Sequence, residues 1–439
     1  MSFEGPDAYS RAGGIATRIC GLTANLAKLG FRTHLWFVGD PDLSGIEERD
    51  GVELHRWCQW ISRYHPGGAY DGEEGKRLDY ASSLPPYIFE KYIVPWLRAG
   101  ERAVVFAEEW HTVDAVLHLD SLLRTAALRD RVNIFWNANN TLGFDRIDWK
   151  RLEQAAIITT VSRYMKQLMR GYGVDTRVIH NGLGADAFLE PDAVACAMRR
   201  RFRDRIVLGK VGRWDPDKNW ILAVAIVAEL KRYGWRPLLL ARGGVESHGA
   251  EVLAAAKNAG LHVIERKLVE PGAEGLLAAT ADVNGADIIN FRSPLDSESS
   301  RTLFRGASAI LANSAHEPFG LVGLEAMAVG GLVCTGGSGE DYAVPGRNAI
   351  VTRTASPKEF IGLWKRFHAD PVANASLRAS ARLTARHYAW PEIIRRGLLL
   401  RIPFVDPGES LRGENERSRA GSFLRMPSSQ VEESLACGT

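Results

Sequence analysis

Runs of apolar and β-branched residues alternate with helix-like patterns along most of the chain. In the first half, such runs predict strands at residues 33–38, 103–107, 132–136 and 157–161. Helical patterns between them predict helices at residues 17–29, 112–124 and 163–172. Strands that alternate with helices are typical of an α/β fold, in which helices cover both faces of a parallel sheet.

A second run of the same kind begins at residue 206. It predicts strands at 206–211, 237–241, 261–265, 287–291, 309–313 and 332–335, and helices at 219–233, 250–258 and 321–329. The strand pattern lapses between residues 182 and 203. We therefore predict a first doubly wound domain over residues 1–190, a second over 191–387, and a final helix at 388–401. The tail at 402–439 is dominated by Pro, Ser, Glu, Arg and Gly, which predicts disorder.

The start of the chain leaves little room for a first strand. A glycine loop normally follows that strand in a doubly wound domain, and here residues 4–11 already look like a loop before Gly13 and Gly14. At most residues 1–3 remain for the strand, which would be central. Either the natural start lies upstream, which we favour, or the sheet is built without this strand. Residues 57–77, rich in Trp, Tyr, Gly and His, are interpreted as a surface excursion.

Composition and charge narrow the class of protein. Hydrophobic residues make up 46% of the chain and charged residues 24%, which is ordinary for a globular protein. The net charge of +3 is too balanced for a dedicated nucleic-acid binder. No apolar run approaches the ~20 residues of a membrane helix. Five scattered cysteines fit a reduced cytosol and give no metal signature, so we expect a cytoplasmic protein without a metal site.

The predicted helix at 163–172 is the one segment that suits contact with a membrane surface. It is basic and carries Met165, Leu168 and Met169. Such a helix could lie on an anionic membrane. A solvated helix with an apolar stripe in the core explains the same residues, and we favour it.

The most informative stretch is residues 317–328, which read Glu-Pro-Phe-Gly-Leu-Val-Gly-Leu-Glu-Ala-Met-Ala between a predicted strand and a predicted helix. A helix N-terminus offers free backbone N–H groups and a partial positive charge, which suit a diphosphate. Glu317 precedes the loop and Glu325 lies in the first turns of the helix. Because a carboxylate can accept hydrogen bonds from two adjacent hydroxyls, this pair suits a nucleotide sugar. The alternative is a capped helix with Glu in its first turn.

Two basic residues and two glycines add weaker signals. Arg213 and Lys218 flank the turn after strand 206–211, and both could reach one diphosphate, although basic residues near helix starts are usually solvated. Gly13 and Gly14 precede the first helix, where paired glycines either let a ligand approach the backbone or form a tight turn. The chain has no G-x-G-x-x-G fingerprint, which disfavours a dinucleotide-dependent oxidoreductase.

Together these residues resemble the retaining glycosyltransferases of family 4, which have the GT-B fold of two facing Rossmann-like domains with a cleft between them. The resemblance covers roughly residues 3–400. Its strongest element is the family's E-x7-E motif, here Glu317 to Glu325. Supporting stretches lie at residues 13–14, 161–163, 178–182, 212–219 and 344–348.

The resemblance implies a role for each motif residue. Glu325 would hold the ribose diol, and Glu317 would touch hydroxyls of the donor sugar. Arg213 and Lys218 would neutralise the diphosphate leaving group, and Gly14 would approach it from the first domain. Backbone groups that would meet the sugar and the phosphate belong to Phe319, Gly320, Leu321 and Val322. Such a site needs no metal or other cofactor, because Arg and Lys supply the charge of a divalent cation.

The sequence departs from the family after the strand at 103–107. Many relatives carry a His there, near the donor sugar, and Glu108 takes its place. Ionised Glu108 could accept a hydrogen bond from a sugar or an acceptor hydroxyl, or it is a solvated residue at a strand end. His111 is a second candidate, or a helix-capping histidine. Asn139 and Asn140 end a strand, where α/β folds place ligands, or they form a turn.

The sequence therefore predicts transfer of a sugar from a nucleoside-diphosphate donor to an unknown hydroxyl acceptor, with retention at the anomeric carbon. One alternative is another GT-B enzyme, such as a sugar-nucleotide epimerase or a phosphorylase. The other is a nucleotide-sugar-binding protein without activity, which the missing His suggests. The expected partners are the donor and the acceptor, with no nucleic acid and at most peripheral membrane contact.

Overall fold

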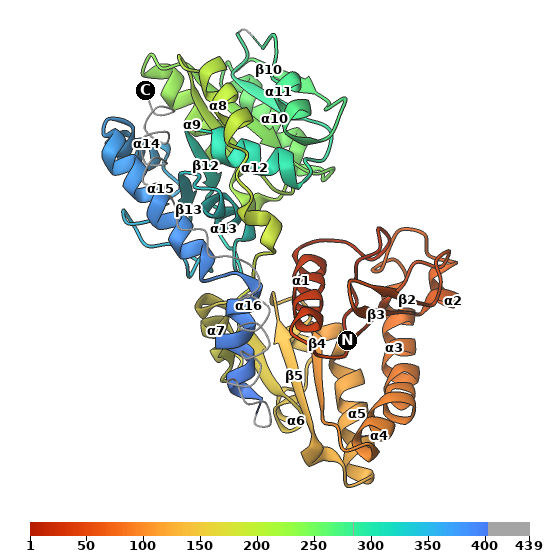
Figure 1. Ribbon diagram of the computed structural model, residues 1–439. Helices are drawn as coiled ribbons and strands as arrows, with labels where there is room; N and C mark the ends of the chain where they lie inside the picture. Colours follow the sequence, from red (N-terminus) through yellow and green to blue (C-terminus); the bar gives the residue numbers. More distant parts are fainter. Residues whose placement is uncertain (284, 403–439) are drawn as a thin grey trace. The chain divides into compact units, whose positions relative to one another are not determined.

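The structure, a computed structural model, describes residues 1–283 and 285–402. The chain forms two compact units (Figure 1). Of the described residues, unit 1 comprises Met1–Gly182 and residues 390–402, and unit 2 comprises Leu183–Ala389. The sequence pattern predicts the break after residue 190, but it lies before Leu183, because this residue donates a backbone hydrogen bond to Tyr388 of unit 2 at 2.7 Å. Residues 403–439, most of the tail predicted to be disordered, lie outside the described residues.

Unit 1 contains two groups of hydrogen-bonded strands. The first has the order β1-β3-β2, in which β2 is antiparallel, and consists of β1 (Thr33–Val38), β2 (Ile46–Arg49) and β3 (Val52–Trp57). The second is parallel throughout and consists of β4 (Ala103–Glu108), β5 (Val132–Ala138), β6 (Ile157–Thr160) and β7 (Arg177–Val178). The four strands predicted for this part of the chain are confirmed, and β2, β3 and β7 are additions that the pattern did not reveal.

Residues 1–3 lie in the strand position between these two groups. The backbone N–H of Ser2 donates to Trp36 of β1 at 3.0 Å, and Val38 donates to Phe3 at 3.3 Å. On the other side, the N–H of Glu108 in β4 donates to Met1 at 3.1 Å. The three residues left over by the sequence pattern therefore join β1 to β4.

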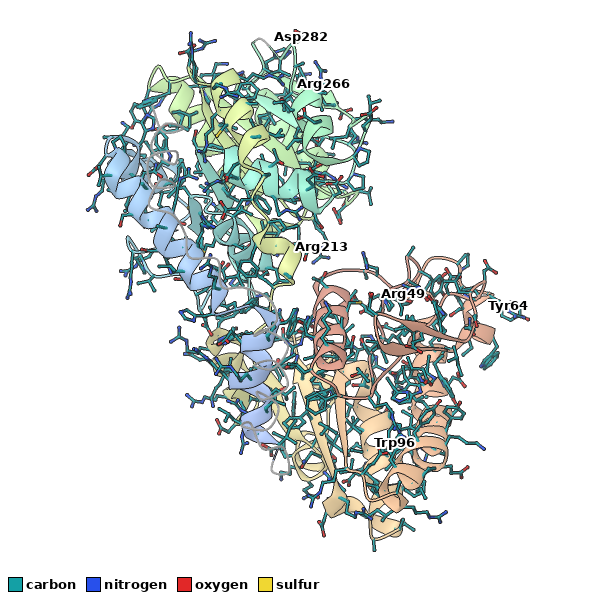
Figure 2. All side chains as sticks on the ribbon, viewed as in Figure 1. Arg49, Tyr64, Trp96, Arg213, Arg266 and Asp282 are labelled. Atoms are coloured by element: carbon teal, nitrogen blue, oxygen red, sulfur yellow. The ribbon has the colours of Figure 1, made fainter. Side chains whose placement is uncertain are left out.

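The helices of unit 1 include two stretches that the sequence pattern did not predict. The predicted helices correspond to α1 (Gly14–Lys28), α5 (Val113–Thr125) and α7 (Arg163–Arg170), and α6 (Trp149–Ala155) lies between the last two. The stretch interpreted as a surface excursion instead contains α2 (Gln59–Ser62) and the start of α3 (Glu73–Ile88), which continues into η1 (Phe89–Ile93) and α4 (Val94–Arg98). Tyr64, just after α2, does point outward and is 80% exposed (Figure 2). The last helical segment of unit 1 consists of α16 (Trp390–Ile393), η7 (Ile394–Leu398) and η8 (Leu399–Arg401).

Unit 2 is built on one parallel sheet with the strand order β10-β11-β9-β8-β12-β13-β14. The strands are β8 (Ile206–Val211), β9 (Pro237–Arg242), β10 (Val263–Arg266), β11 (Ile288–Phe291), β12 (Ala309–Ala312), β13 (Val333–Thr335) and β14 (Ile350–Val351). The helices are α8 (Asp192–Arg201), α9 (Trp220–Arg232), α10 (His248–Asn258), α11 (Gly272–Ala279), α12 (Ser297–Gly306), α13 (Leu321–Ala328), α14 (Pro357–His368) and α15 (Pro371–Arg386). Every strand predicted for this half is present.

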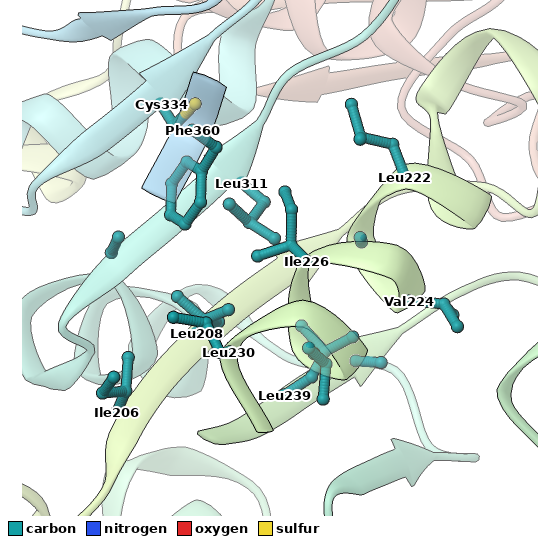
Figure 3. Packing of buried hydrophobic residues seen from close by; sticks show 14 of the residues in the cluster. Ile206, Leu208, Leu222, Val224, Ile226, Leu230, Leu239, Leu311, Cys334 and Phe360 are labelled. Atoms are coloured by element: carbon teal, nitrogen blue, oxygen red, sulfur yellow. The ribbon is translucent and has the colours of Figure 1, made fainter. Parts of the chain in front are cut away.

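The core of unit 2 forms between the sheet and the helices that pack on it (Figure 3). Leu208 of β8 and Leu311 of β12 are buried together with Ile226 of α9 and Phe360 of α14. Each buried side chain of this size contributes roughly 1.5–3 kcal/mol of burial free energy. This rigid sheet positions the loops at the carboxyl ends of β8, β12 and β13.

Among the described residues, no helix has both the length and the apolar character that a membrane span requires.

Candidate functional site

The start of α13 is an uncapped helix N-terminus that follows β12. Gly320 adopts φ = +79° to turn the chain into the helix, a conformation that favours glycine. No side chain of the described residues caps this first turn. Its backbone N–H groups and the positive end of the helix dipole are therefore available to an anionic ligand.

Glu317 and Lys218, 99 residues apart in the chain, meet beside this helix start. The Lys218 ammonium donates to Oε2 of Glu317 at 2.5 Å, and the hydroxyl of Ser314 donates to the same oxygen at 2.9 Å. The loops that carry the two residues are also joined directly, because the N–H of Ala315 donates to the carbonyl of Asp217 at 2.7 Å. The pair is partly exposed, so a ligand can reach both groups.

Arg213 lies on the same loop as Lys218 with its guanidinium largely free. Its side chain is 66% exposed, and its nearest recorded partner is Asp215 at 3.8 Å (Figure 2). Its carbonyl is fixed by the indole N–H of Trp220, which donates to it at 2.6 Å. The backbone at Arg213 is thus anchored while the charged group can move towards a ligand.

Glu325 lies on α13, one to two turns beyond Gly320. Burial raises its pKa to about 7, and the negative charge of Asp186 acts in the same direction. A carboxyl group with this pKa exchanges its proton near neutral pH. It can therefore donate a hydrogen bond to a hydroxyl as well as accept one.

The glycine-rich loop after β13 supports the α13 loop and was missed by sequence reasoning. The Ser338 hydroxyl accepts from the N–H of Glu317 at 2.9 Å, and the hydroxyl of Tyr342 donates to the carbonyl of Gly320 at 2.5 Å. A Cβ at Gly339 would lie 2.1 Å from the carbonyl oxygen of Glu317, so glycine is needed for this close approach. The glycine pair after a predicted strand at 332–335 is the signal that could have revealed the loop.

Behind the loop, two buried groups hold the strand ends. The ammonium of Lys210 in β8 donates to the carbonyl of Leu311 at 2.9 Å and to the side-chain oxygen of Asn313 at 3.0 Å. Burial lowers the pKa of Lys210 to about 7. The ring of Phe319 is buried against Tyr342, at 5.9 Å between ring centroids. The predicted donor-binding residues Leu321 and Val322 are half-buried on the first turn of α13.

In unit 1, the predicted glycine loop is capped from within the chain. Oε2 of Glu4 accepts from the N–H of Gly13 at 3.1 Å and of Ala16 at 3.0 Å, at the start of α1. Its other oxygen accepts from the hydroxyl of Tyr70 at 2.8 Å. A Cβ at Gly13 or at Gly14 would meet no atom within 4 Å, so the space beside both glycines is open.

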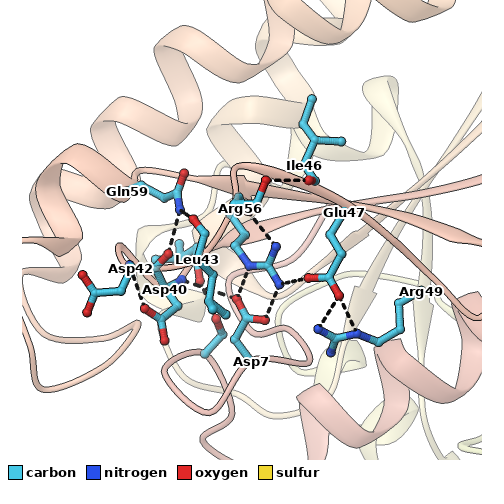
Figure 4. Close-up of polar contacts among 12 residues, drawn as sticks. Asp7, Asp40, Asp42, Leu43, Ile46, Glu47, Arg49, Arg56 and Gln59 are labelled. Carbon is cyan, nitrogen blue, oxygen red and sulfur yellow. Dashed lines mark hydrogen bonds and ion pairs between the residues drawn. The ribbon is translucent and has the colours of Figure 1, made fainter.

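A buried ion pair anchors the segment that leads into this loop (Figure 4). Arg56 of β3 donates to both oxygens of Asp7, at 2.7 and 2.9 Å, and to Glu47 at 2.6 Å. The side chains of Arg56 and Asp7 are at most 1% exposed. The segment that the sequence identified as loop is therefore fixed to the sheet through Asp7.

Glu108, predicted to take the place of the family's His, is a buried residue and not a solvated one. It is 1% exposed, and Arg18 donates to its Oε1 at 3.1 Å. The side-chain amides of Asn137 and Asn139 donate to Oε2 at 2.9 and 2.8 Å. Both oxygens are occupied, so its direct contact with a sugar stays a prediction.

His111, the second candidate, is also buried. Its Nε2 contacts Glu73, and its ring stacks on Phe3 at 4.5 Å between centroids. Burial lowers its pKa, which favours the neutral ring. The side chain of Asn140 accepts a hydrogen bond from the backbone N–H of Leu142 at 2.8 Å. This bond belongs to a turn, which was the alternative interpretation of Asn140.

Glu109, beside these residues, had no signal in the sequence. It adopts φ = +67°, a conformation that is uncommon for residues other than glycine. Its Oε1 accepts from the backbone N–H of Asn139 at 2.6 Å. Burial raises its pKa to about 8. The end of β4 thus carries two adjacent buried carboxyl groups in different environments.

Comparison with known proteins shows which family the chain resembles. The sequence profile described as Glycosyltransferase Family 4 matches residues 12–186. The D-inositol 3-phosphate glycosyltransferase of Streptomyces avermitilis is 28% identical over 241 residues, 53% of this chain and 48% of the relative. The protein of the same description from Stackebrandtia nassauensis is 25% identical over 411 residues, 86% of this chain and 84% of the relative. Residues 12–186 are therefore similar to the family 4 glycosyltransferases. The chain spans about half the length of the first of these relatives.

Several solved structures share the fold of this chain. The sucrose-phosphate synthase from Thermosynechococcus elongatus is 19% identical with a TM-score of 0.62, over 90% of this chain and 94% of that one. Anabaena HepE, solved in complex with UDP-glucose, is 14% identical with a TM-score of 0.60, over 94% of this chain and 100% of that one. The predicted α/β fold of the GT-B class is confirmed.

Proposed function

We propose that the protein transfers a glycosyl group from a nucleoside-diphosphate sugar to a hydroxyl acceptor. The observation that carries the proposal is the Lys218–Glu317 contact beside the uncapped start of α13, with Glu325 further along the same helix. Positive charge, free N–H groups and two carboxyl groups match what such a donor presents, which is a diphosphate, sugar hydroxyls and a ribose diol. The similarity of residues 12–186 to the Glycosyltransferase Family 4 profile supports the same interpretation.

The proposed chemistry needs stabilisation of a leaving group. The bond between the anomeric carbon and the diphosphate oxygen breaks, and its electron pair stays on the diphosphate. Lys218, Arg213 and the first turn of α13 stabilise the charge that develops there. Lys218 exchanges Glu317 for the diphosphate when the donor binds, which frees Glu317 to accept from sugar hydroxyls.

The stereochemical outcome that we propose is retention. The acceptor oxygen attacks the anomeric carbon on the face that the diphosphate leaves, and the hydroxyl proton passes to the departing diphosphate. In this reaction no side chain forms a covalent intermediate, and the positive charge comes from protein side chains. A polyol hydroxyl, as in the names of the curated relatives, is the acceptor class to test first.

A thermal-shift panel with UDP, GDP and ADP tests the donor site. A nucleoside diphosphate at 100 times its dissociation constant adds about 2.7 kcal/mol to the stability of the unit that binds it. We expect one of the three to raise the melting temperature of the wild type. Lys218→Ala and Glu325→Ala should lose most of this shift and reduce transfer by about 100-fold or more.

Lys231→Ala is the matched control, because Lys231 forms an ion pair with Asp287 at 2.7 Å in the same unit but outside the proposed site. It should keep the wild-type shift and rate. If none of the three diphosphates changes melting at millimolar concentration, the proposal is wrong.

Incubation of the donor without an acceptor separates the alternatives. An epimerase changes the sugar under these conditions, whereas a transferase leaves its configuration intact. The occupied oxygens of Glu108 favour a protein that binds nucleotide sugars without turnover as the second candidate. Binding of a diphosphate with no transfer to any acceptor in a broad panel would support it.

A further inference from the structure

Three potential metal ligands meet on one face of the sheet in unit 1, away from the strand ends discussed so far. His34 lies near the start of β1, and Glu53 and His55 lie two residues apart on β3. In the parallel register, His34 pairs with Glu53 and Trp36 pairs with His55, so that the three side chains share a face. Nδ1 of His34 lies 3.2 Å from Nε2 of His55 and 3.5 Å from Oε1 of Glu53. Nε2 of His55 and Oε1 of Glu53 are 3.0 Å apart.

Hydrogen bonds alone cannot satisfy this triangle of atoms. Each imidazole nitrogen carries at most one proton, and the carboxylate carries none. If both nitrogens are protonated, two N–H groups face each other across the 3.2 Å contact. If one is protonated, two lone pairs face each other elsewhere in the triangle. One of the three contacts is therefore always repulsive without a further positive charge.

A cation satisfies all three contacts together. Zinc bonds of 2.0–2.1 Å in a tetrahedron place ligand atoms about 3.3 Å apart, and the three distances here bracket that value. Two imidazoles and one carboxylate suit zinc, whereas magnesium and calcium prefer oxygen ligands.

The surroundings hold the ligands in place and leave one side open. The side chains of His34 and His55 are 6% and 2% exposed, while Glu53 is 38% exposed and gives access from solvent. The hydroxyl of Tyr92 donates to Oε1 of Glu53 at 3.2 Å, which orients the carboxylate. Trp96 packs against the ring of His34 at 5.1 Å and limits its movement (Figure 2).

We propose that His34, Glu53 and His55 bind one zinc ion, with a water molecule in the fourth position. Nε2 of His34 has no partner among the described residues, and it keeps its proton when Nδ1 binds the metal. The ion would link β1 to β3 near their amino ends. It takes no part in the proposed transfer, whose groups lie at the carboxyl ends of strands in the other unit.

The test is direct titration of the full-length, untagged protein after chelator treatment. Isothermal calorimetry with Zn²⁺ should give one site per chain with a dissociation constant in the micromolar range or below. Glu53→Gln and His55→Gln should each weaken binding at least tenfold. Mg²⁺ at the same concentration should produce no binding heat.

His65→Gln is the matched control, because Nδ1 of His65 also faces a carboxylate, Asp71 at 3.3 Å, but without a third ligand. It should bind Zn²⁺ like the wild type. Substitution of Co²⁺ gives a second readout, since the intensity of its visible bands distinguishes four from six ligands. The proposal is wrong if the wild type binds less than one fifth of an equivalent of Zn²⁺, or if Glu53→Gln binds Zn²⁺ with unchanged affinity. Because Glu53 is half-exposed, this variant provides the test even if His55→Gln fails to fold.

Discussion

Glu340 is a buried carboxyl group of the glycine-rich loop with one oxygen, Oε1, that has no partner among the described residues. Burial raises its pKa to about 7, and the charge of Glu317 adds to the effect. Because this pKa lies above the ordinary value of 4.5, folding favours the protonated form. Its contribution to stability is complete below about pH 4.5 and is lost as the pH rises through about 7.

Glu340→Gln should therefore become progressively more stable than the wild type between pH 5 and pH 8.5. Glutamine keeps an acceptor for the N–H of Ser338 and carries no charge to bury. The difference should be near zero at pH 5 and up to about 3 kcal/mol at pH 8.5, as measured by denaturant unfolding. Glu274→Gln, at an exposed position, is the control and should show no pH-dependent difference. An equal difference at both pH values would contradict the argument.

Arg56 is expected to be among the most important single residues for the stability of unit 1. Removing it leaves Asp7 buried without its partner, which typically costs about 3–5 kcal/mol for a buried ion pair. Arg56→Ala should lower the unfolding free energy by this amount. Arg49→Ala, which removes an exposed pair with Glu47, should change it by less than about 1 kcal/mol. Similar values for the two variants would refute the prediction.

The residues of the proposed donor site in unit 2 were easier to predict than the candidate residues of unit 1. Glu317, Gly320 and Glu325 lie in one short motif. This motif indicates a ligand site because a predicted strand precedes it and a predicted helix follows it. Lys218 depends on a partner 99 residues away, yet its place in the turn that follows β8 was visible in the strand pattern. The burial of Glu108 could not be predicted, because it follows from Arg18 of α1 and from Asn137 and Asn139 at the end of β5, which the fold brings to β4.

At the scale of elements, the turn into α13 depends on one glycine. A Cβ at Gly320 would lie 2.9 Å from both Cγ of Glu340 and the hydroxyl of Tyr342, and φ = +79° adds backbone strain. Gly320→Ala should destabilise unit 2 by about 1–3 kcal/mol and weaken diphosphate binding. Gly337→Ala is the control, since its Cβ would meet no atom within 4 Å. If Gly320→Ala melts at the wild-type temperature, this view of the loop is incorrect.

Strands were predicted better than helices along the chain. The β1 and β8 strands have the predicted bounds because apolar, β-branched runs between polar segments define both ends. The α3 helix was missed because Pro85 and Pro86 lie inside it and lack the N–H groups that helix hydrogen bonds require. The helix accommodates both prolines in its last turn, directly before the π-helical turn η1. A π-helical turn has no sequence signature.

At the scale of the whole molecule, unit 1 is completed by the last described segment of the chain. Trp390 is 2% exposed. A Cβ at Gly21 would lie 2.1 Å from its ring, and one at Gly182 would lie 2.4 Å from it. Both glycines are therefore needed to accommodate the indole.

Trp390→Ala should destabilise unit 1 by about 3–5 kcal/mol, because it opens a cavity between these glycines. Calorimetry resolves the effect if the two units unfold in separate transitions. The transition of unit 1 should then move to lower temperature while a nucleoside diphosphate still raises that of unit 2. Trp60→Ala, at a position that is 63% exposed, should leave both transitions in place.

The chain crosses from unit 1 to unit 2 and back at neighbouring points. Leu183 and Ala389 form a bridge within unit 2, so that unit 2 brings together two residues separated by roughly 200 positions. Closing a loop of that length costs about 5 kcal/mol of chain entropy. This entropy is lost when unit 2 folds. The packing of Trp390 against Gly182 then requires no further loop closure, because the two residues are already at high effective concentration. Folding of unit 2 therefore lowers the entropic cost of packing the segment that begins at Trp390 against a part of the chain synthesised long before it.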